Sequence, residues 1–208
     1  GSEEAFNAQF GTNFDVAAAT LISQKILQKK RNELEQFEIK ELPGVPHVES
    51  FVWKPDYEPM NQLRNDHIII TCDIAEGVGL DHTVFMINRM IEPGTNKTEC
   101  VGMFRNNKLQ RNECALILQL LSIYHCNFDR LLISLEYNTY GELFLYSMDT
   151  YMESNQEIAE RFDESCLVKY YNESGRRYTR GIKVTPGNKS THCLLFKEEY
   201  ERNISNNN

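Results

Sequence analysis

Hydrophobic and polar positions along the chain predict alternating strands and helices beyond residue 66. Residues 67–75, 82–89 and 99–104 are rich in apolar and β-branched side chains, and short segments containing Gly separate them. This pattern predicts three strands joined by turns. Residues 112–125 repeat apolar side chains at helical spacing, and residues 131–136 form another apolar run that predicts a buried strand.

The remainder of this region predicts a helix, a short strand and a final helix, over residues 143–152, 166–171 and 189–201. Three consecutive strands with short connections, followed by alternating helices and strands, predict an α/β protein with a mixed central sheet flanked by helices. This order, in which a meander precedes a parallel continuation, is that of a ribonuclease H-like fold. We therefore expect one such domain over residues 66–208.

Residues 1–65 predict an N-terminal arm or linker that is not a domain of its own. Its first two residues, Gly1 and Ser2, are typical of a cloning remnant. A helix, two short strands and a Pro-rich polar loop are expected within the arm, over residues 20–28, 37–42, 48–53 and 54–65.

Length and composition bound the class of protein. The chain has 208 residues, 41% of them hydrophobic, which is enough for a substantial core, and its formal net charge is −8. Every apolar run is too short for a transmembrane helix or a signal peptide, so we expect no membrane partner. The six cysteines are scattered without a paired CxxC motif, which favours buried free thiols in a reducing compartment over a zinc site.

One segment departs from the acidic average of the chain. Between residues 169 and 189 there are six basic side chains and a single acidic one, Glu173. The basic residues are Lys169, Arg176, Arg177, Arg180, Lys183 and Lys189. Both a solvated loop of ordinary arginine content and a nucleic-acid contact fit this composition.

The strand and turn around Asp73 carry the clearest chemical signal. Asp73 lies in an apolar, β-branched run, where a carboxylate has a large desolvation cost unless a cation or a donor meets it. Gly77 and Gly79 allow a sharp turn, and Asp81 follows them. The spacing is not that of GxxxxGK[ST] and no lysine follows, so we reject a phosphate-binding P-loop.

A second apolar run that predicts a strand, residues 131–135, is also followed by an acid, Glu136. If the two strands are parallel neighbours, Asp73 and Glu136 emerge together at their carboxyl ends, the usual place for a site in open α/β sheets. Two carboxylates so close need a cation, and hard oxygen ligands select Mg²⁺ or Mn²⁺. Two such ions about 4 Å apart would suit phosphodiester hydrolysis.

Ordinary structural roles compete with this interpretation. An acid near a strand end is more often a surface residue or a cap than a metal ligand. Asp73 and Glu136 together are therefore stronger evidence for a metal site than either acid alone. Asp81 could simply cap the hairpin. The histidines at 67, 82, 125 and 192 show no ligand spacing, and only His82, beside Asp81, is a candidate. A serine hydrolase has no support, because no GxSxG motif is present.

These motifs resemble a known family. The run Asp73-Ile74-Ala75-Glu76-Gly77-Val78-Gly79-Leu80-Asp81-His82 is similar to the signature of the nuclease domain of the large terminase subunit of tailed bacteriophages, on the myophage side. The run Leu135-Glu136-Tyr137-Asn138-Thr139-Tyr140-Gly141 is similar to that family's strand ending in Glu-x-Asn-x-x-Gly. Residues 181–197 and 10–23 also resemble the family, so the resemblance covers nearly the whole chain.

The resemblance implies a ribonuclease H-like endonuclease that cuts concatemeric phage DNA during genome packaging. Asp73 and Glu136 match the first two catalytic, metal-binding acids, which hold Mg²⁺ or Mn²⁺, and Asp81 matches an auxiliary catalytic acid. The family's third acid has no counterpart here, and we expect the domain to be truncated before it. Phosphate contacts are expected from Arg176, Arg177, Arg180, Lys183 and Lys189.

The same resemblance implies double-stranded DNA, the portal protein and the small terminase subunit as partners, in the cytoplasm of the host cell. Two alternatives remain open. A non-catalytic DNA- or partner-binding module of the same fold is one, because the third acid is not found. An actin-like or sugar-kinase-like ATPase is the other, but it needs a second Asp-Gly turn that the sequence does not repeat.

Overall fold

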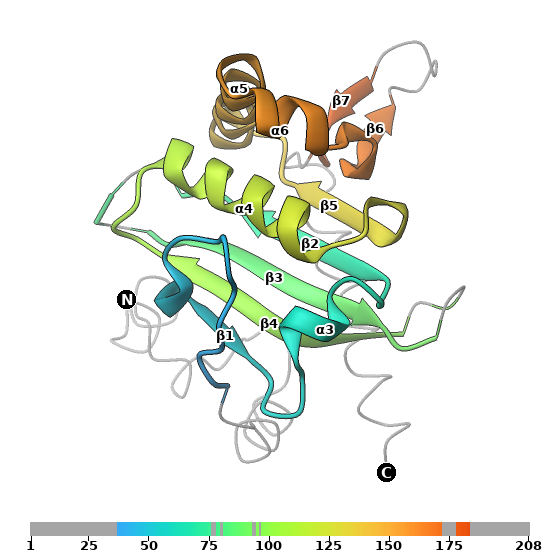
Figure 1. Cartoon of the computed structure of the whole chain (residues 1–208). Coiled ribbons are helices and arrows are strands. Elements are labelled where there is room, and N and C mark those ends of the chain that lie inside the picture. The colour runs from blue at the N-terminus through green and yellow to red at the C-terminus, as the bar shows by residue number, and fades with distance from the viewer. Residues whose placement is uncertain are drawn as a thin grey trace, which may run out of the picture. The chain divides into compact units, whose positions relative to one another are not determined.

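A five-stranded mixed sheet forms the centre of the computed structural model (Figure 1). Its strands are β1 (Phe51–Trp53), β2 (Ile68–Asp73), β3 (Thr83–Met90), β4 (Thr98–Asn106) and β5 (Leu131–Leu135). They lie in the order β1-β4-β3-β2-β5, with β5 parallel to β2 and all other pairs antiparallel. A mixed central sheet flanked by helices was expected from the sequence, and this architecture is confirmed.

The structure describes only part of the 208-residue chain. The described residues are 37–75, 78–79, 81–92, 95, 97–171 and 178–183. They belong to one compact unit that spans Gln36–Val184. The helices expected at residues 20–28 and 189–201 lie outside the described residues.

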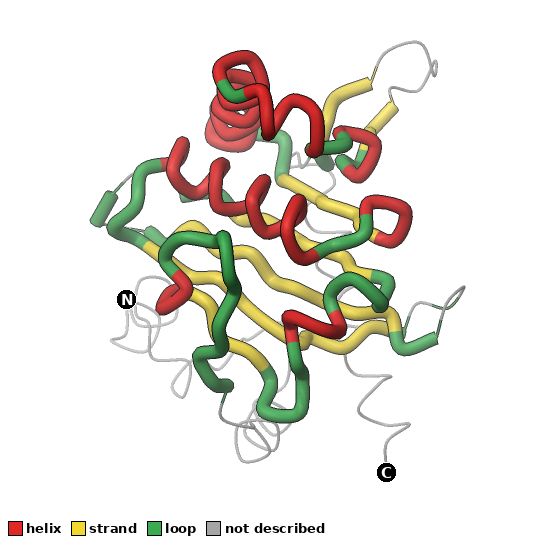
Figure 2. The backbone as a smooth tube through the Cα atoms, viewed as in Figure 1, coloured by secondary structure: helices red, strands yellow, loops and turns green. Residues whose placement is uncertain are grey.

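Three helices gather on one side of the sheet (Figure 2). They are α4 (Arg111–His125), α5 (Thr139–Ser154) and α6 (Gln156–Arg161). The first turn of α4 is fixed by the backbone N–H of Gln110, which donates to Glu113 Oε2 at 2.7 Å. Asn138 and Asn155 cap α5 and α6, because their side-chain oxygens accept from backbone N–H groups of the first turn.

Smaller elements complete the described unit. They are the helix α3 (Pro59–Gln62), the 3₁₀ turns η1 (Val48–Ser50), η2 (Phe128–Arg130) and η3 (Glu164–Cys166), and the two-stranded sheet of β6 (Lys169–Tyr171) and β7 (Tyr178–Arg180). No described helix has both the length and the apolar character needed to cross a bilayer.

The core lies between the sheet and the helices, because alternate strand positions point to that side. On β2 these are Ile68, Ile70 and Cys72, and on β5 they are Leu131, Ile133 and Leu135, all of them buried. The intervening positions of both strands are exposed or half-buried. A cluster of buried rings continues the core across β3, β4 and β1, and it comprises Phe85, Phe104, Phe51 and Trp53. One face of the sheet is therefore packed and the other is open to polar chemistry.

Residues 37–65 are part of this core, whereas the sequence predicted an arm up to residue 65. Trp53, Tyr57 and Leu63 are fully buried, and β1 pairs with β4. Gly102 of β4 lets the Trp53 ring lie directly on the backbone, because a Cβ at that position would collide with the indole. The expected strand at residues 37–42 is reduced to a bridge between Glu38 and Trp53. The domain boundary expected at residue 65 therefore falls inside the structural unit.

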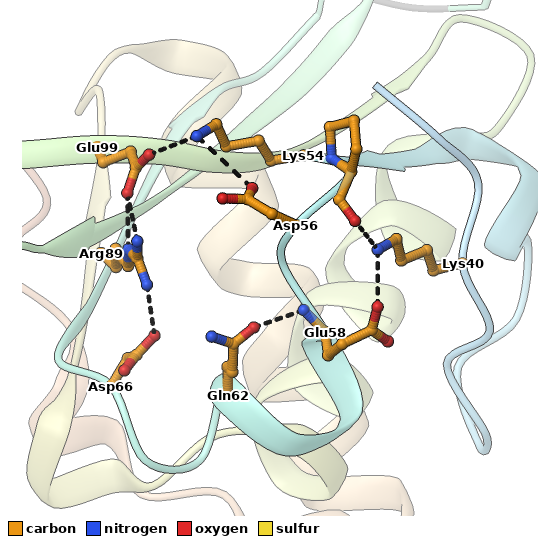
Figure 3. A network of polar contacts seen from close by, with 9 residues as sticks. Lys40, Lys54, Asp56, Glu58, Gln62, Asp66, Arg89 and Glu99 are labelled. Atoms are coloured by element: carbon orange, nitrogen blue, oxygen red, sulfur yellow. Dashed lines mark hydrogen bonds and ion pairs between the residues drawn. The ribbon is translucent and has the colours of Figure 1, made fainter. Parts of the chain in front are cut away.

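An ion-pair network joins this segment to the sheet (Figure 3). Lys54 Nζ lies 2.9 Å from Glu99 Oε1, and Arg89 Nη2 lies 2.7 Å from Glu99 Oε2. Partial burial raises the pKa of Glu99, but the hydrogen bonds from Lys54 and Arg89 outweigh it and hold the pKa below its ordinary value. Nearby, burial and the charge of Asp66 raise the pKa of the Tyr57 hydroxyl far above its usual range.

Five of the six cysteines can be compared with the expectation of buried free thiols, since Cys193 lies outside the described residues. Cys72, Cys114, Cys126 and Cys166 are buried and Cys100 is half-buried, and all five are free. Burial raises the pKa of Cys126 and of Cys166 to about 12, so neither is a thiolate at neutral pH.

Replacement of the buried indole tests whether residues 37–65 belong to the folded unit. We expect Trp53→Ala to lower the free energy of unfolding by about 3–5 kcal/mol, because it leaves a large cavity against Gly102. Ile39→Ala is the matched control in the same segment, since Ile39 is 61% exposed, and it should change stability by less than about 0.5 kcal/mol. Urea denaturation followed by circular dichroism measures both variants. Equal, small effects would show that this segment is an arm after all.

Candidate functional site

Parallel pairing of β2 with β5 brings the two candidate acids to one level of the sheet. The register runs from Ile68 opposite Leu131 to Cys72 opposite Leu135. Asp73 is the last residue of β2, and Glu136 comes directly after β5. The ladder ends at that pair, and Asp73 and Glu136 are the next residue along each of these neighbouring chain segments, whose backbones are about 4.8 Å apart within the ladder.

Alternation of side chains sets both acids on the same face of the sheet. Cys72 and Leu135 point into the core, and the next residue of each strand points to the other side. Asp73 is accordingly exposed and Glu136 half-buried. Continuation of the register and of this alternation beyond the last pair predicts that the two carboxylates share a level and a face, as the binding of one cation requires.

Two hydrogen bonds with Ile182 hold the backbone before and after Glu136. Tyr137 N–H donates to the carbonyl of Ile182 at 2.7 Å, and Ile182 N–H donates to the carbonyl of Leu135 at 2.6 Å. Glu136 and Ile182 thus form a parallel bridge at the end of β5. Gly181, with φ of +96°, precedes this bridge, and a Cβ there would lie 2.7 Å from the Leu135 carbonyl oxygen.

The spacing Glu-x-Asn-x-x-Gly now has a physical explanation. Asn138 Oδ1, two residues after the acid, accepts from the backbone N–H groups of Tyr140 and Gly141 at 3.0 and 2.9 Å and so caps the start of α5. Gly141 then packs against the carbonyl oxygen of Glu136 so closely that any Cβ would collide with it. The motif therefore fixes the position of the Glu136 backbone relative to the first turn of α5.

Asp81 lies exposed in a different environment from the acid pair. It lines a pocket of about 260 Å³ at the carboxyl end of β2, together with Ala75, Thr83 and Arg111. Neither Asp73 nor Glu136 lines this pocket. Thr83 Oγ1 accepts from Ala75 N–H at 3.1 Å and closes the base of the turn between β2 and β3. His82, the histidine candidate, follows Asp81 and is half-buried.

Of the five basic residues predicted to contact DNA, Arg180 and Lys183 are described, and Arg176, Arg177 and Lys189 lie outside the described residues. Arg180 makes two contacts of 2.6 Å with the carboxylate of Asp149 and one of 2.7 Å with Glu164. The hydrogen bonds with Asp149 are the main reason that the pKa of Arg180 is raised. Arg180 therefore ties β7 to α5 and η3.

A second pocket, of about 540 Å³, opens beside this arginine and was not anticipated from the sequence. Tyr137, Tyr146, Tyr178 and Glu142 line it together with Arg180. Burial, reinforced by the charge of Glu142, raises the pKa of the Tyr137 hydroxyl. The residues come from four separate elements of the chain, so no local spacing could have indicated them.

The donor chemistry of the pair fits a hard divalent cation. Asp73 and Glu136 offer carboxylate oxygens, which Mg²⁺ and Mn²⁺ prefer over nitrogen or sulfur ligands. Among the residues that the structure describes, no group of three or more His, Cys, Asp or Glu side chains could hold a metal ion.

Comparison with known proteins adds no relative to this picture. No family model matches the chain, and no curated protein matches it either.

Replacement of Gly141 tests the packing that fixes Glu136. A glycine-to-alanine change within a helix ordinarily stabilises it, by about 0.5–1 kcal/mol. We expect the opposite sign for Gly141→Ala, a loss of about 1–3 kcal/mol, because the new Cβ meets the Glu136 carbonyl and that backbone must shift. Leu143→Ala, at a 44% exposed position of the same helix, is the control and should have a small effect. A Gly141→Ala protein as stable as the wild type in urea denaturation would contradict this packing.

Proposed function

We propose that this chain is a metal-dependent DNA endonuclease of ribonuclease H-like fold, akin to the nuclease domain of a large terminase subunit. The single observation that supports the proposal is the register of β2 and β5, which ends with Cys72 opposite Leu135, directly before Asp73 and Glu136. Two acids have no structural reason to meet there without a cation, because their like charges repel.

The order of the strands supports the fold assignment. The meander β2-β3-β4 is followed by α4 and then by β5, which returns to lie parallel to β2 at the other edge of the meander. A ribonuclease H-like fold has this arrangement of a meander with a parallel continuation. Strand β1 extends the sheet beyond β4 and is an addition to that pattern.

Within this proposal the chain's own residues hold and orient the substrate. Asp73 and Glu136 would bind Mg²⁺ or Mn²⁺, and Gly141 with the Ile182 bridge would keep the Glu136 backbone in place. A divalent ion between them would supply the positive charge that stabilises a phosphodiester during its hydrolysis. Asp81, which is outside the pair, would act as an auxiliary acid at the turn that follows β2.

Contacts with DNA are proposed for the basic segment, but Arg180 is given a structural role. Its two carboxylate partners, Asp149 and Glu164, compete with any phosphate for the guanidinium. By the resemblance, the phosphate contacts are proposed for Arg176, Arg177, Lys183 and Lys189, and Arg180 holds β7 in position. By the resemblance, the substrate is concatemeric viral DNA, and the portal protein and small terminase subunit are partners in the host-cell cytoplasm.

A second candidate function is a DNA- or partner-binding module of the same fold without catalysis. The observation that favours it is the lack of a third metal-ligating side chain beside the pair among the described residues. Such a module would bind DNA with the same dependence on salt but would not nick it with any divalent ion.

Cleavage of supercoiled plasmid DNA tests the proposal. We expect nicking that requires Mn²⁺ or Mg²⁺ and stops with excess EDTA. Asp73→Asn and Glu136→Gln should each lower the rate by about 100-fold or more, because even the outer partners of metal ligands commonly matter 10- to 100-fold. Glu153→Gln, at an exposed acid on α5, is the control and should cut like the wild type.

Equal cutting in excess EDTA would overturn the nuclease proposal. DNA binding without nicking in either metal would instead select the non-catalytic module.

A further inference from the structure

Arg105 lies in the same row of the sheet as the acid pair, although it is remote in sequence. Asp73 of β2 is opposite Val84 of β3, and Val84 is opposite Arg105 of β4. With Glu136 opposite Asp73, one row crosses four neighbouring strands. At about 4.8 Å per strand, the Arg105 backbone is about 10 Å from that of Asp73.

Burial shows that Arg105 faces the same side as the acids. Phe104 is fully buried among the core rings, and the next residue, Arg105, is exposed on the opposite face. Val84, between Asp73 and Arg105 in the row, is half-buried and uncharged. The row therefore presents two carboxylates, an apolar position and a guanidinium, in that order.

The environment of Arg105 differs from that of three other described arginines. Arg89, Arg161 and Arg180 form ion pairs with carboxylates, at 2.7, 2.7 and 2.6 Å. For Arg105 the neighbouring group is the His82 ring, whose Nδ1 lies 3.5 Å from Nη2. No carboxylate of the described residues forms an ion pair with Arg105, not even Asp81 next to His82. Among the described residues, the guanidinium of Arg105 and the imidazole of His82 thus lie side by side without a carboxylate partner.

We propose that Arg105, with His82 beside it, binds a backbone phosphate of the DNA next to the one held at Asp73 and Glu136. This inference rests on the proposed function, since it takes DNA as the substrate. An arginine fork matches phosphate oxygens better than any other side chain. The contact would position the DNA without reading its sequence.

A phosphate contact at Arg105 would also determine how the DNA lies across the sheet. The described end of the basic segment, residues 178–183, adjoins the edge of β5, because Ile182 pairs with the residues around Glu136. Arg105 lies on the other side of the acid pair, on β4. A duplex bound along the row would therefore extend from the acids toward Arg105.

The salt dependence of DNA binding tests Arg105. Affinity for a fluorescently labelled DNA duplex is measured over a range of salt concentrations for the full chain, with Ca²⁺ in place of Mg²⁺. Each lost phosphate contact lowers the slope of log affinity against log salt by about 0.9. We expect this loss for Arg105→Gln and a wild-type slope for Arg105→Lys, which keeps the charge.

Lys97→Gln is the matched control, because Lys97 is an exposed cation in the connection between β3 and β4, at the opposite end of these strands from Arg105. It should leave the slope unchanged, and equal melting temperatures show that the variants are folded. The same slope for Arg105→Gln as for Lys97→Gln overturns the role of Arg105 while the nuclease proposal stands. A wild-type chain that binds DNA without any salt dependence overturns both.

Discussion

Electrostatic repulsion between two carboxylates that the backbone brings together is the constraint on which the site depends. Parallel pairing of β2 with β5 fixes the position of one strand relative to the other, because each residue of one strand faces a defined residue of the other. In the proposed site, Asp73 and Glu136 lie on the face opposite the buried apolar residues. Such a pair is stabilised when a cation joins the two carboxylates.

The surrounding structure maintains this juxtaposition through backbone contacts. Gly141 and Asn138 start α5 against the Glu136 carbonyl, and Ile182 pairs with the chain on both sides of that acid. Arg180 belongs to the same support, since its ion pairs with Asp149 fix the strand that leads into Ile182. Residues that touch no substrate in the proposed function thus determine where an acid lies.

The sequence was sufficient to predict the elements with continuous apolar runs. Strands β2, β3, β4 and β5 and helix α4 bury one face each, so their periodicity is visible locally. The segment with Trp53 was misjudged because β1 is only three residues long and pairs with a strand about fifty positions away. The two candidate acids were identified from the ends of two apolar runs, whereas the role of Arg180 depends on partners in α5 and η3 that no local pattern reveals. Arg105 was missed because an outward-facing arginine on a strand looks like any solvated position.

A shared ion is most directly detected by measuring Mn²⁺ affinity for the wild type, Asp73→Asn, Glu136→Gln and the double variant. If both carboxylates bind the same ion, each single substitution should remove most of the affinity, and the second should then add little, so that the two effects are strongly non-additive. If Mn²⁺ binds all four proteins equally, or if the two losses are independent, Asp73 and Glu136 do not share a cation and the proposed site is wrong.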